Sequence, residues 1–492
     1  MTGDRLSLAT LPRVEAARRP RVDPRALGTG VVHLGIGAFH RAHQAVYTED
    51  AVAAAGGDWG ICGVTQRSRA VLDQLRPQDG LYTVLERSTS TSLRVVGAVR
   101  DLVFAAEEPE RLTARSRARH PRRHADRHGE GLSARPGHRP AADGRPRRRR
   151  RPGRGRPGAD GGRAARAWPA GPPRRRRRPG HPAVLRQPPG QRGGAARAGR
   201  RVLRRVARRR AARRLGGRVV RFPSSMVDRI VPATTDGDRT EAARLLGLDD
   251  RGVVVTEPFR QWVVEDDFAA GRPAWDAAGA MLTADVAPYE AMKLRLLNGS
   301  HSALAYLGAL AGHAYVADAV GDEGIAGVVE HLMADEVTPT LTVPGGFDVA
   351  AYRRELLDRF RNPALHHRTT QIATDGSQKL PQRLLGTIAD RLAAGAAPRL
   401  ACLGVAAWMR YVWAGKAEDG TPLPVDDPLA GRLAELTAGA DTPAAVVDAL
   451  LSLDEVFGTD LPGDPVFREL VLDGLARLTR DGVATTVRAA LG

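Results

Sequence analysis

The chain has 492 residues, 42% of them hydrophobic, so it is long enough for two or three domains with apolar cores. Its 75 basic and 55 acidic residues give a net charge of +20, which alone would indicate a nucleic-acid or anionic-membrane binder. The distribution of charge excludes that conclusion for most of the chain. Residues 117–214 contain 34 Arg, no Lys and four acidic residues, a net of +30, which leaves −10 for the remainder.

Other bulk features indicate a cytoplasmic globular protein. The two cysteines, Cys62 and Cys402, are too few for a disulfide framework, and we expect ordinary buried thiols in a reducing compartment. The first residues lack the apolar core of a secretory signal. No run of about 18 uninterrupted apolar residues occurs, because His313 and Asp318 break the most Ala-rich stretch.

The N-terminal third alternates β-prone and helical segments. The order strand, glycine turn, helix, strand predicts a parallel α/β sheet. We expect strands at 31–35 and 59–65, helices at 41–55 and 68–75, and further strands at 81–86 and 93–99. From Pro288 onward, Ala- and Leu-rich stretches of helical period, such as 291–311 and 443–453, predict a second, mainly helical domain.

The Arg-rich segment has 13 Pro and 15 Gly in 117–214, and neither helical nor strand periodicity survives there. As written it is expected to be disordered and to form no sheet or helix. Because the whole chain has only three lysines, the gene is inferred to be GC-rich, and such a gene translated out of frame yields Arg, Pro, Gly and Ala. In one shifted frame, residues 124–133 can encode Thr-Leu-Thr-Val-Thr-Glu-Lys-Gly-Tyr and residues 182–194 can encode Pro-Ser-Cys-Asp-Asn-Leu-Pro-Gly-Asn-Gly. We therefore favour a frameshift over a genuine basic insertion.

A nucleic-acid-binding protein that uses this segment is the alternative from a different functional class. Binding of single strands generally needs aromatic side chains on which bases stack. The segment offers only Trp168, so the sequence does not favour this alternative.

A glycine motif follows the first predicted strand and opens a helix. Glycines there allow a tight turn and let backbone N–H groups approach a pyrophosphate at the helix N-terminus. The predicted cofactor-binding residues are Gly35, Gly37, Ala38, Phe39, His40 and Arg41. His40 replaces the usual third glycine, and a plain glycine turn would give a similar pattern. Arg67, after the second strand, leaves room for a 2′-phosphate, so NAD and NADP both remain open.

Three polar residues recur along one predicted helix: Lys293, Asn298 and His301. At 3.6 residues per turn, Asn298 lies about 140° and His301 about 80° from Lys293, so all three can face one cleft. A lysine among apolar neighbours has a lowered pKa and can act as a base near neutrality. Asn298 can donate to a reacting oxygen, and His301 can hold substrate or lysine. Spacing alone would favour a plainer interpretation: a surface lysine, an Asn-Gly interruption of the helix and a core histidine.

These segments together resemble the polyol-specific long-chain dehydrogenase family, also called the mannitol dehydrogenase family. The resemblance rests on Val32 to His43, Phe222 to Pro232, Glu257 to Trp262 and the Lys293/Asn298/His301 helix, in family order. It implies a Rossmann-type NAD(P)-binding domain over 25–285, interrupted by segment 116–215, and a helical substrate and catalytic domain over 286–492. It also implies no metal, Lys293 as general base, Asn298 and His301 as assisting groups, and Asp228 and Arg229 in substrate binding. Asp228-Arg229 could instead be a surface ion pair of little functional value.

The predicted substrate is a sugar acid. Residues 375–383 resemble the fructuronate reductase (mannonate oxidoreductase) branch, in which Lys379 or Arg383 could pair with a carboxylate. Either cation could instead be a solvated loop charge. We favour interconversion of D-mannonate and D-fructuronate, with mannitol and fructose as the alternative. Family members carry strands, one with a substrate-contacting Asn, that only the shifted frame restores, so we expect the literal chain to be unstable or inactive.

Overall fold

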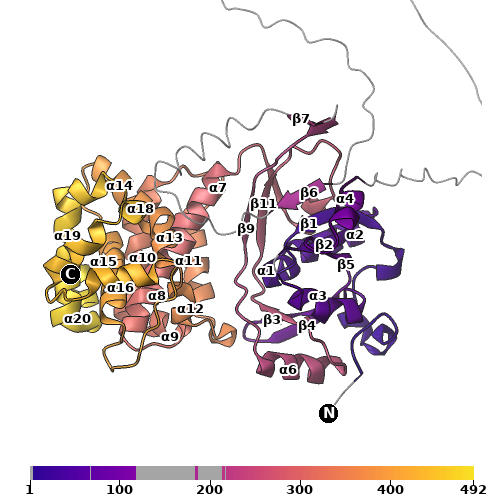
Figure 1. Cartoon of the computed structure of the whole chain (residues 1–492), viewed down its shortest axis with the longest axis horizontal. Helices are drawn as coiled ribbons and strands as arrows, with labels where there is room; N and C mark the ends of the chain where they lie inside the picture. Colours follow the sequence, from indigo (N-terminus) through magenta and orange to yellow (C-terminus); the bar gives the residue numbers. More distant parts are fainter. Residues whose placement is uncertain (1–3, 67, 118–182, 187–212, 216–217) are drawn as a thin grey trace, which may run out of the picture. The chain divides into compact units, whose positions relative to one another are not determined.

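The structure, a computed structural model, describes residues 4–66, 68–117, 183–186, 213–215 and 218–492 (Figure 1). Most of the Arg-rich segment, to which the predictions of disorder and a frameshift apply, lies outside the described residues. Arg67, on which the NADP alternative depended, also lies outside them.

A parallel sheet forms the centre of the N-terminal part, with strand order β5-β2-β1-β6. Its strands are β1 (Thr29–Leu34), β2 (Gly60–Thr65), β5 (Val99–Phe104) and β6 (Ala183–Arg186), and every neighbouring pair is parallel. Helices α1 (Ala38–Ala42) and α2 (Gln44–Ala55) connect β1 to β2, and α3 (Ala70–Leu75) and α4 (Pro109–Arg117) follow. The predicted strand, turn, helix and strand order is therefore confirmed.

Strand β6 corrects one prediction, because it belongs to the segment that was expected to form no sheet. Its register pairs Val31 with Ala183 and Leu34 with Arg186. Ala183, Val184 and Leu185 form a short apolar run, and β1 offers it an edge on which to pair. A short apolar run can thus extend a sheet even where the surrounding sequence shows no periodicity.

The other strands form smaller sheets. The predicted strands at 81–86 and 93–99 are β3 (Tyr82–Arg87) and β4 (Thr91–Val96), an antiparallel hairpin joined by β10 (Val254–Thr256) and separate from the parallel sheet. A further sheet contains β9 (Ser225–Asp228), β11 (Gln261–Glu265) and β12 (Met281–Thr283). β7 (Arg213–Leu215) pairs with β8 (Arg218–Val220), and α6 (Asp236–Leu246) precedes β10.

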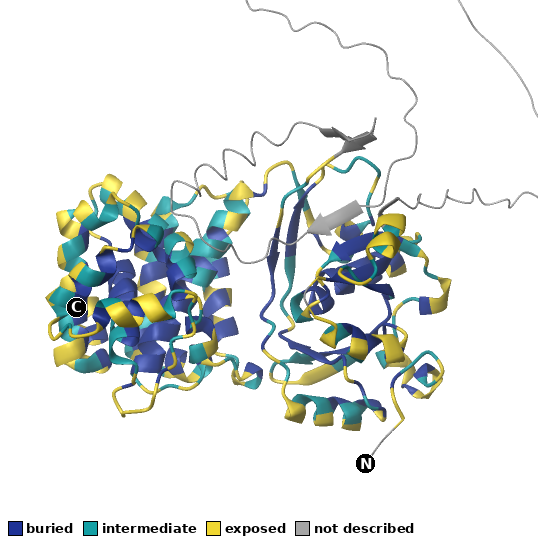
Figure 2. Ribbon diagram, viewed as in Figure 1, coloured by how far each residue is buried: buried dark blue, intermediate teal, exposed yellow. Residues whose placement is uncertain are grey.

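The C-terminal part is helical, as predicted, and shares one large apolar core in which α8 and most of α15 are buried (Figure 2). Its α-helices are α7 (Ala287–Met292), α8 (Ser300–Leu310), α9 (Val316–Gly321), α10 (Glu323–His331), α11 (Val349–Phe360), α12 (Thr369–Ala373), α13 (Gly376–Leu380), α14 (Gly386–Ala393), α15 (Arg399–Ala414), α16 (Ala430–Thr437), α17 (Pro443–Leu451), α18 (Asp454–Phe457), α19 (Pro465–Arg480) and α20 (Gly482–Leu491). The predicted fold class, a Rossmann-type domain followed by a helical domain, is confirmed.

The helix predicted over 291–311 contains a wider, π-helical stretch that spacing did not reveal. Residues Lys293–Gly299 form this stretch, η6, between α7 and α8, and a second π-helical stretch, η10, covers Pro381–Leu385. The two pack closely, since a Cβ on Gly299 would lie 2.6 Å from the carbonyl oxygen of Arg383. Such π-helical turns often mark functional sites, and here they carry candidate site residues.

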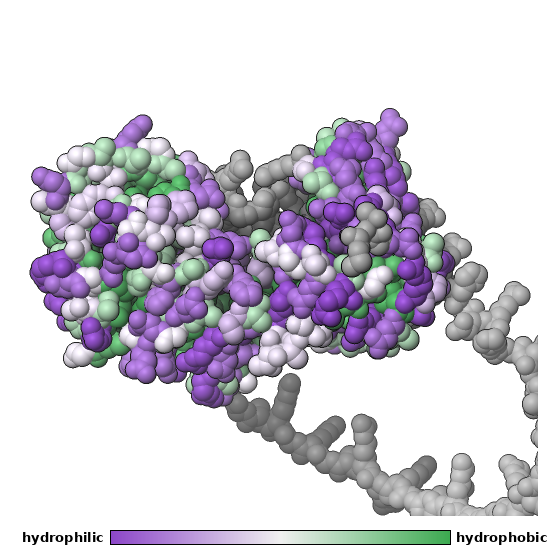
Figure 3. All heavy atoms as spheres, turned by 90° about the horizontal axis from the view of Figure 1, so that it is seen from below, coloured by the Kyte–Doolittle hydropathy of each residue, from purple (hydrophilic) through white to green (hydrophobic). Residues whose placement is uncertain are grey.

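The structure bears on two predictions made from composition, those about the cysteines and about membrane-spanning segments. Cys62 and Cys402 are buried free thiols, as expected. No helix within the described ranges has the length and apolarity needed to cross a bilayer. On the face shown in Figure 3, hydrophilic residues cover most of the surface and hydrophobic residues gather in small patches.

Candidate active site

The glycine turn after β1 has an open outer face. Gly35 adopts a positive φ of 109° and donates its N–H to the Val64 carbonyl at 2.8 Å, which fixes the turn against β2. A Cβ placed on Gly35 or Gly37 would meet no atom within 4 Å. Gly37 is also the residue before α1. A dinucleotide pyrophosphate can therefore approach this backbone, so the residues present fit the predicted cofactor.

The side chains of His40 and Arg41 point into the protein. His40 is buried and stacks on His33, with ring centroids 3.5 Å apart. The Arg41 guanidinium donates to the Gly252 carbonyl and lies 5.5 Å from the centre of the Tyr82 ring. Any contribution of these two predicted residues to the cofactor would come from their backbone. Ala38 and Phe39 are half-buried, and Phe39 packs against His43.

Lys293 lies in an environment that favours its neutral form. Burial lowers the pKa of its amine below the ordinary value, and the positive charges of Arg383 and Arg359 lower it further. The negative charges of Asp228 and Glu290 oppose this change. The structure thus gathers charged groups from several elements around Lys293, as a proton-accepting lysine requires.

Asn298 lies in the same π-helical stretch as Lys293. Asn298 is five positions after Lys293, and a π turn is closed by hydrogen bonds between residues five apart. Asn298 therefore lies closer to the side of Lys293 than the α-helical spacing predicted. The backbone carbonyl of Asn298 accepts from Arg383 at 3.4 Å, and Arg383 also donates to Ser302 Oγ at 2.8 Å. Within the described residues the Asn298 amide side chain has no hydrogen-bond partner, so it is available to a substrate oxygen.

His301 is buried at the start of α8 and is held by aromatic contacts. It stacks on Phe360, with ring centroids 4.9 Å apart, and meets His367 edge-on at 5.1 Å. Burial lowers the pKa of His301 well below its usual value, and His367, Arg383 and Arg359 act in the same direction. The imidazole is therefore neutral at physiological pH and can hydrogen-bond to a substrate without competing for the proton of Lys293.

Asp228 ends β9 and is bound by an arginine that the sequence did not single out. Arg359, on α11, donates to both Asp228 oxygens at 2.8 and 3.0 Å and to both Glu257 oxygens at 2.8 and 3.0 Å. The neighbouring Arg229 donates to the Ala42 and Glu257 carbonyls and to the Glu86 carboxylate. Because each Arg229 nitrogen already has a protein partner, this geometry favours a structural role over the predicted substrate contact.

Lys379 and Arg383 lie near each other and near the histidines. Lys379 Nζ donates to Thr374 Oγ1 at 3.1 Å and to the Ile372 carbonyl at 3.2 Å. Burial, together with the positive charge of Arg383 and against the opposing effect of Asp375, lowers the pKa of Lys379 to about 8. Burial also lowers the pKa of Arg383 to about 10. Neither cation forms an ion pair with any residue that the structure describes.

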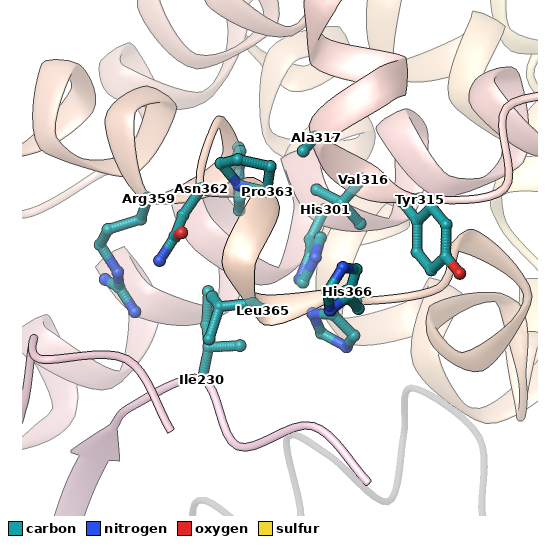
Figure 4. Close-up of a pocket in the computed structure, with 12 residues that line it drawn as sticks. Ile230, His301, Tyr315, Val316, Ala317, Arg359, Asn362, Pro363, Leu365 and His366 are labelled. Carbon is teal, nitrogen blue, oxygen red and sulfur yellow. The ribbon is translucent and has the colours of Figure 1, made fainter. Parts of the chain in front are cut away.

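A small pocket adjoins this site (Figure 4). His301 and Arg359 line it, and Ile230 reaches it from a separate loop. The described part of the chain contains no group of three or more His, Cys, Asp or Glu side chains that could hold a metal ion.

The structure brings several predicted site residues close together. The charges of Asp228 and Arg383 act on Lys293, and the charges of Arg383 and Lys379 act on His301. Sequence reasoning missed Arg359 and His367. The signal for Arg359 was an arginine beside Leu356, Leu357 and Phe360 on the buried face of an amphipathic helix. His367 had no signal in a single sequence.

Comparison with known proteins places this chain among oxidoreductases. It is 39% identical to the uncharacterized oxidoreductase YeiQ of Escherichia coli, over 97% of each chain. It is 38% identical to the D-mannonate oxidoreductase of the same organism, over 96% of this chain and 97% of that one. A solved structure of mannitol 2-dehydrogenase from Pseudomonas fluorescens, in complex with NAD and D-mannitol, superposes with a TM-score of 0.76 and 28% identity over 99% of each chain.

The fold and these relatives define a nicotinamide-dependent oxidoreductase that acts on a CH–OH group. Residues 29–118 and 195–277 match the mannitol dehydrogenase Rossmann domain, and residues 285–479 match the mannitol dehydrogenase C-terminal domain. The chain belongs to the mannitol dehydrogenase family. Residues 119–194, inside the Arg-rich segment, lie outside both matches.

Proposed function

We propose that this protein interconverts a sugar acid and its keto form, D-mannonate and D-fructuronate, with NAD as cofactor. The observation that carries the proposal is a group of cations without carboxylate partners. Lys293, Lys379 and Arg383 form no ion pairs among the described residues, although burial lowers the pKa of each. Partly buried cations without an anionic partner are costly unless a ligand supplies the anion, and a sugar-acid carboxylate would do so.

Lys293 is the proposed general base. During oxidation, neutral Nζ takes the proton of the substrate hydroxyl as the C–O single bond becomes a carbonyl, and during reduction the ammonium returns it. Bound NAD would supply the acceptor for the hydride that leaves the same carbon. The Asn298 amide donates a hydrogen bond to the reacting oxygen, where negative charge develops, and neutral His301 holds the adjacent hydroxyl.

Asp228 has an indirect part in this proposal. Both of its oxygens accept from Arg359, and the two charges act on Lys293 in opposite directions: that of Asp228 raises the pKa of the amine and that of Arg359 lowers it. A second lone pair on each carboxylate oxygen can still accept a substrate hydroxyl. Asp228 thereby orients substrate and tunes the base at once.

The second candidate is mannitol 2-dehydrogenase activity, favoured by the solved relative that holds D-mannitol. The discriminating experiment compares kcat/KM for D-mannonate and D-mannitol with NAD, in the chain as given and in a form re-encoded in the shifted frame between the codons for Leu112 and Phe222. A site built around a carboxylate should prefer the acid by about a hundredfold or more, since losing one charge-assisted contact leaves its cationic partners unpaired. Equal efficiency, or preference for mannitol, would refute the sugar-acid assignment.

A further inference from the structure

The inner side of the glycine turn is fixed by a histidine that the proposed chemistry does not use. His33, near the end of β1, places Nδ1 2.6 Å from the Gly35 carbonyl oxygen. The Gly35 N–H donates to Val64 in the neighbouring strand. Both polar groups of this glycine are thus bonded toward the protein, while its outer face is open.

The partner atoms determine the tautomer of His33. A carbonyl oxygen can only accept, so Nδ1 must carry the hydrogen and donate it. Burial lowers the pKa of His33 to about 4, although the hydrogen bond to Gly35 and the nearby Gln44 side chain oppose this, so the ring is neutral near pH 7. Its Nε2 then carries a lone pair that is buried without a partner among the described residues. An apolar side chain would avoid that cost but would also lose the 2.6 Å bond to the Gly35 carbonyl.

His40 fixes the plane of the His33 ring. The two rings stack with centroids 3.5 Å apart and planes inclined by 22°. His40 Nδ1 lies 3.1 Å from Gln44 Oε1, which anchors the second ring to α2. A ring held on its face can rotate little, so the Nδ1–H remains directed at the carbonyl.

We propose that His33 is a positioning residue for the nucleotide-binding turn, which holds the Gly35 carbonyl inward so that the turn stays open to the anionic part of a nicotinamide dinucleotide. The inference rests on the nucleotide site proposed for Gly35 and Gly37. Without this bond the peptide after Gly35 can rotate and present its carbonyl oxygen to the phosphates, which it would repel. His33 then affects nucleotide affinity and leaves the chemistry at Lys293 unchanged.

The test measures the NADH dissociation constant by fluorescence titration of the full chain and of its variants. His33→Leu removes the donor, and we expect affinity to fall about tenfold, the equivalent of one hydrogen bond. His33→Asn retains a donor near the Nδ1 position and should stay within about threefold of the unaltered chain. Cys62→Ala removes a buried side chain from the neighbouring strand β2 and leaves both hydrogen bonds of Gly35 in place, so it should also bind nearly normally.

A second measurement separates positioning from misfolding. Each variant's thermal unfolding midpoint is recorded with and without NADH, and a folded His33→Leu chain should show a smaller NADH-induced rise. Equal loss of affinity in His33→Leu and Cys62→Ala, or full affinity in His33→Leu, would overturn the inference. Gly37→Val, which fills the open face, tests the site itself: if it binds NADH normally, the proposed nucleotide site is wrong, whatever the His33 variants do.

Discussion

Arg359 binds both carboxylate oxygens of Asp228, at 2.8 and 3.0 Å, and so joins α11 to the end of β9. The same guanidinium binds Glu257 and lies 3.9 Å from the centre of the Phe259 ring. All three charged side chains are almost fully buried. Removal of the arginine would leave two carboxylates unpaired inside the protein.

Arg359→Met should therefore destabilise the protein strongly. Breaking a buried ion pair by removal of one partner typically costs about 3–5 kcal/mol, because the remaining charge loses its compensation. Equilibrium unfolding in urea measures this loss. The control is Arg361→Met, directly after the end of α11, at an exposed residue whose bond to Asp358 is 3.3 Å long, and it should change stability by less than about 0.5 kcal/mol. Similar losses in both variants would contradict a special role for Arg359.

Lys293→Ala should lower kcat by about 10²- to 10⁴-fold, the usual contribution of a general base, while NADH affinity is retained. In the unaltered protein the oxidation rate should rise with pH to a plateau, since only the deprotonated amine accepts a proton. The midpoint should lie below the ordinary pKa of lysine because burial lowers the pKa of Lys293. A pH-independent rate would argue against this base.

Glu290→Gln should shift that pH profile. Glu290 raises the pKa of Lys293, so its neutralisation should move the midpoint to lower pH. Glu330→Gln removes an exposed acid of α10 that is not among the charges acting on Lys293, and its profile should match that of the unaltered protein. The comparison uses kcat/KM from pH 6 to 10. A shift of the midpoint to higher pH in Glu290→Gln would count against Lys293 as the group that titrates.

Arg383→Met and Lys379→Met should weaken the binding of an acid substrate more than that of a polyol. If these cations bind a carboxylate, each change should raise the KM for D-mannonate at least about tenfold and change the KM for D-mannitol much less. The polyol serves as the internal control, because a general distortion of the site would weaken both substrates alike. Parallel losses for both substrates would remove the support for a carboxylate site.

Sequence reasoning succeeded where local pattern decides the structure. The strands at 31–35 and 59–65 are apolar runs bounded by glycine, and both lie in the parallel sheet. The Arg359 contacts could not be predicted, because a single arginine on a helix resembles a surface charge and its partners lie 131 and 102 residues away.

The π-helical turn at Lys293–Gly299 was also beyond local pattern. Gly299 in this turn packs against the Arg383 carbonyl, which is a tertiary contact that the local sequence does not show. The three residues of the proposed catalytic group could be named from their spacing and their resemblance to a family. The wider turn that carries two of them, however, depends on packing.

Acid should destabilise the protein over a defined range. Burial lowers the pKa of His33 and His367 to about 4 and of His43 to about 3, below the value near 6.5 in an unfolded chain. Between these values the unfolded state binds more protons, so stability is fully present above pH 6.5 and is lost as pH falls toward 4. Thermal unfolding midpoints at pH 7, 6, 5 and 4 should fall progressively. His43→Gln, which keeps a donor toward the Gln261 carbonyl, should show a shallower decline, and an identical slope would exclude His43 as a contributor.

The Arg-rich segment carries the last prediction. A chain re-encoded in the shifted frame between the codons for Leu112 and Phe222 should be obtained in higher soluble yield and should turn over NADH faster than the chain as given. The physical reason is the charge: +30 within residues 117–214 repels itself, and these residues supply little apolar surface for a core. Both forms retain Lys293, Asn298 and His301, so a difference in activity would be due to the segment. Normal NADH turnover by the chain as given, or an undisturbed frame on resequencing the gene, would show that the segment is a genuine part of the enzyme.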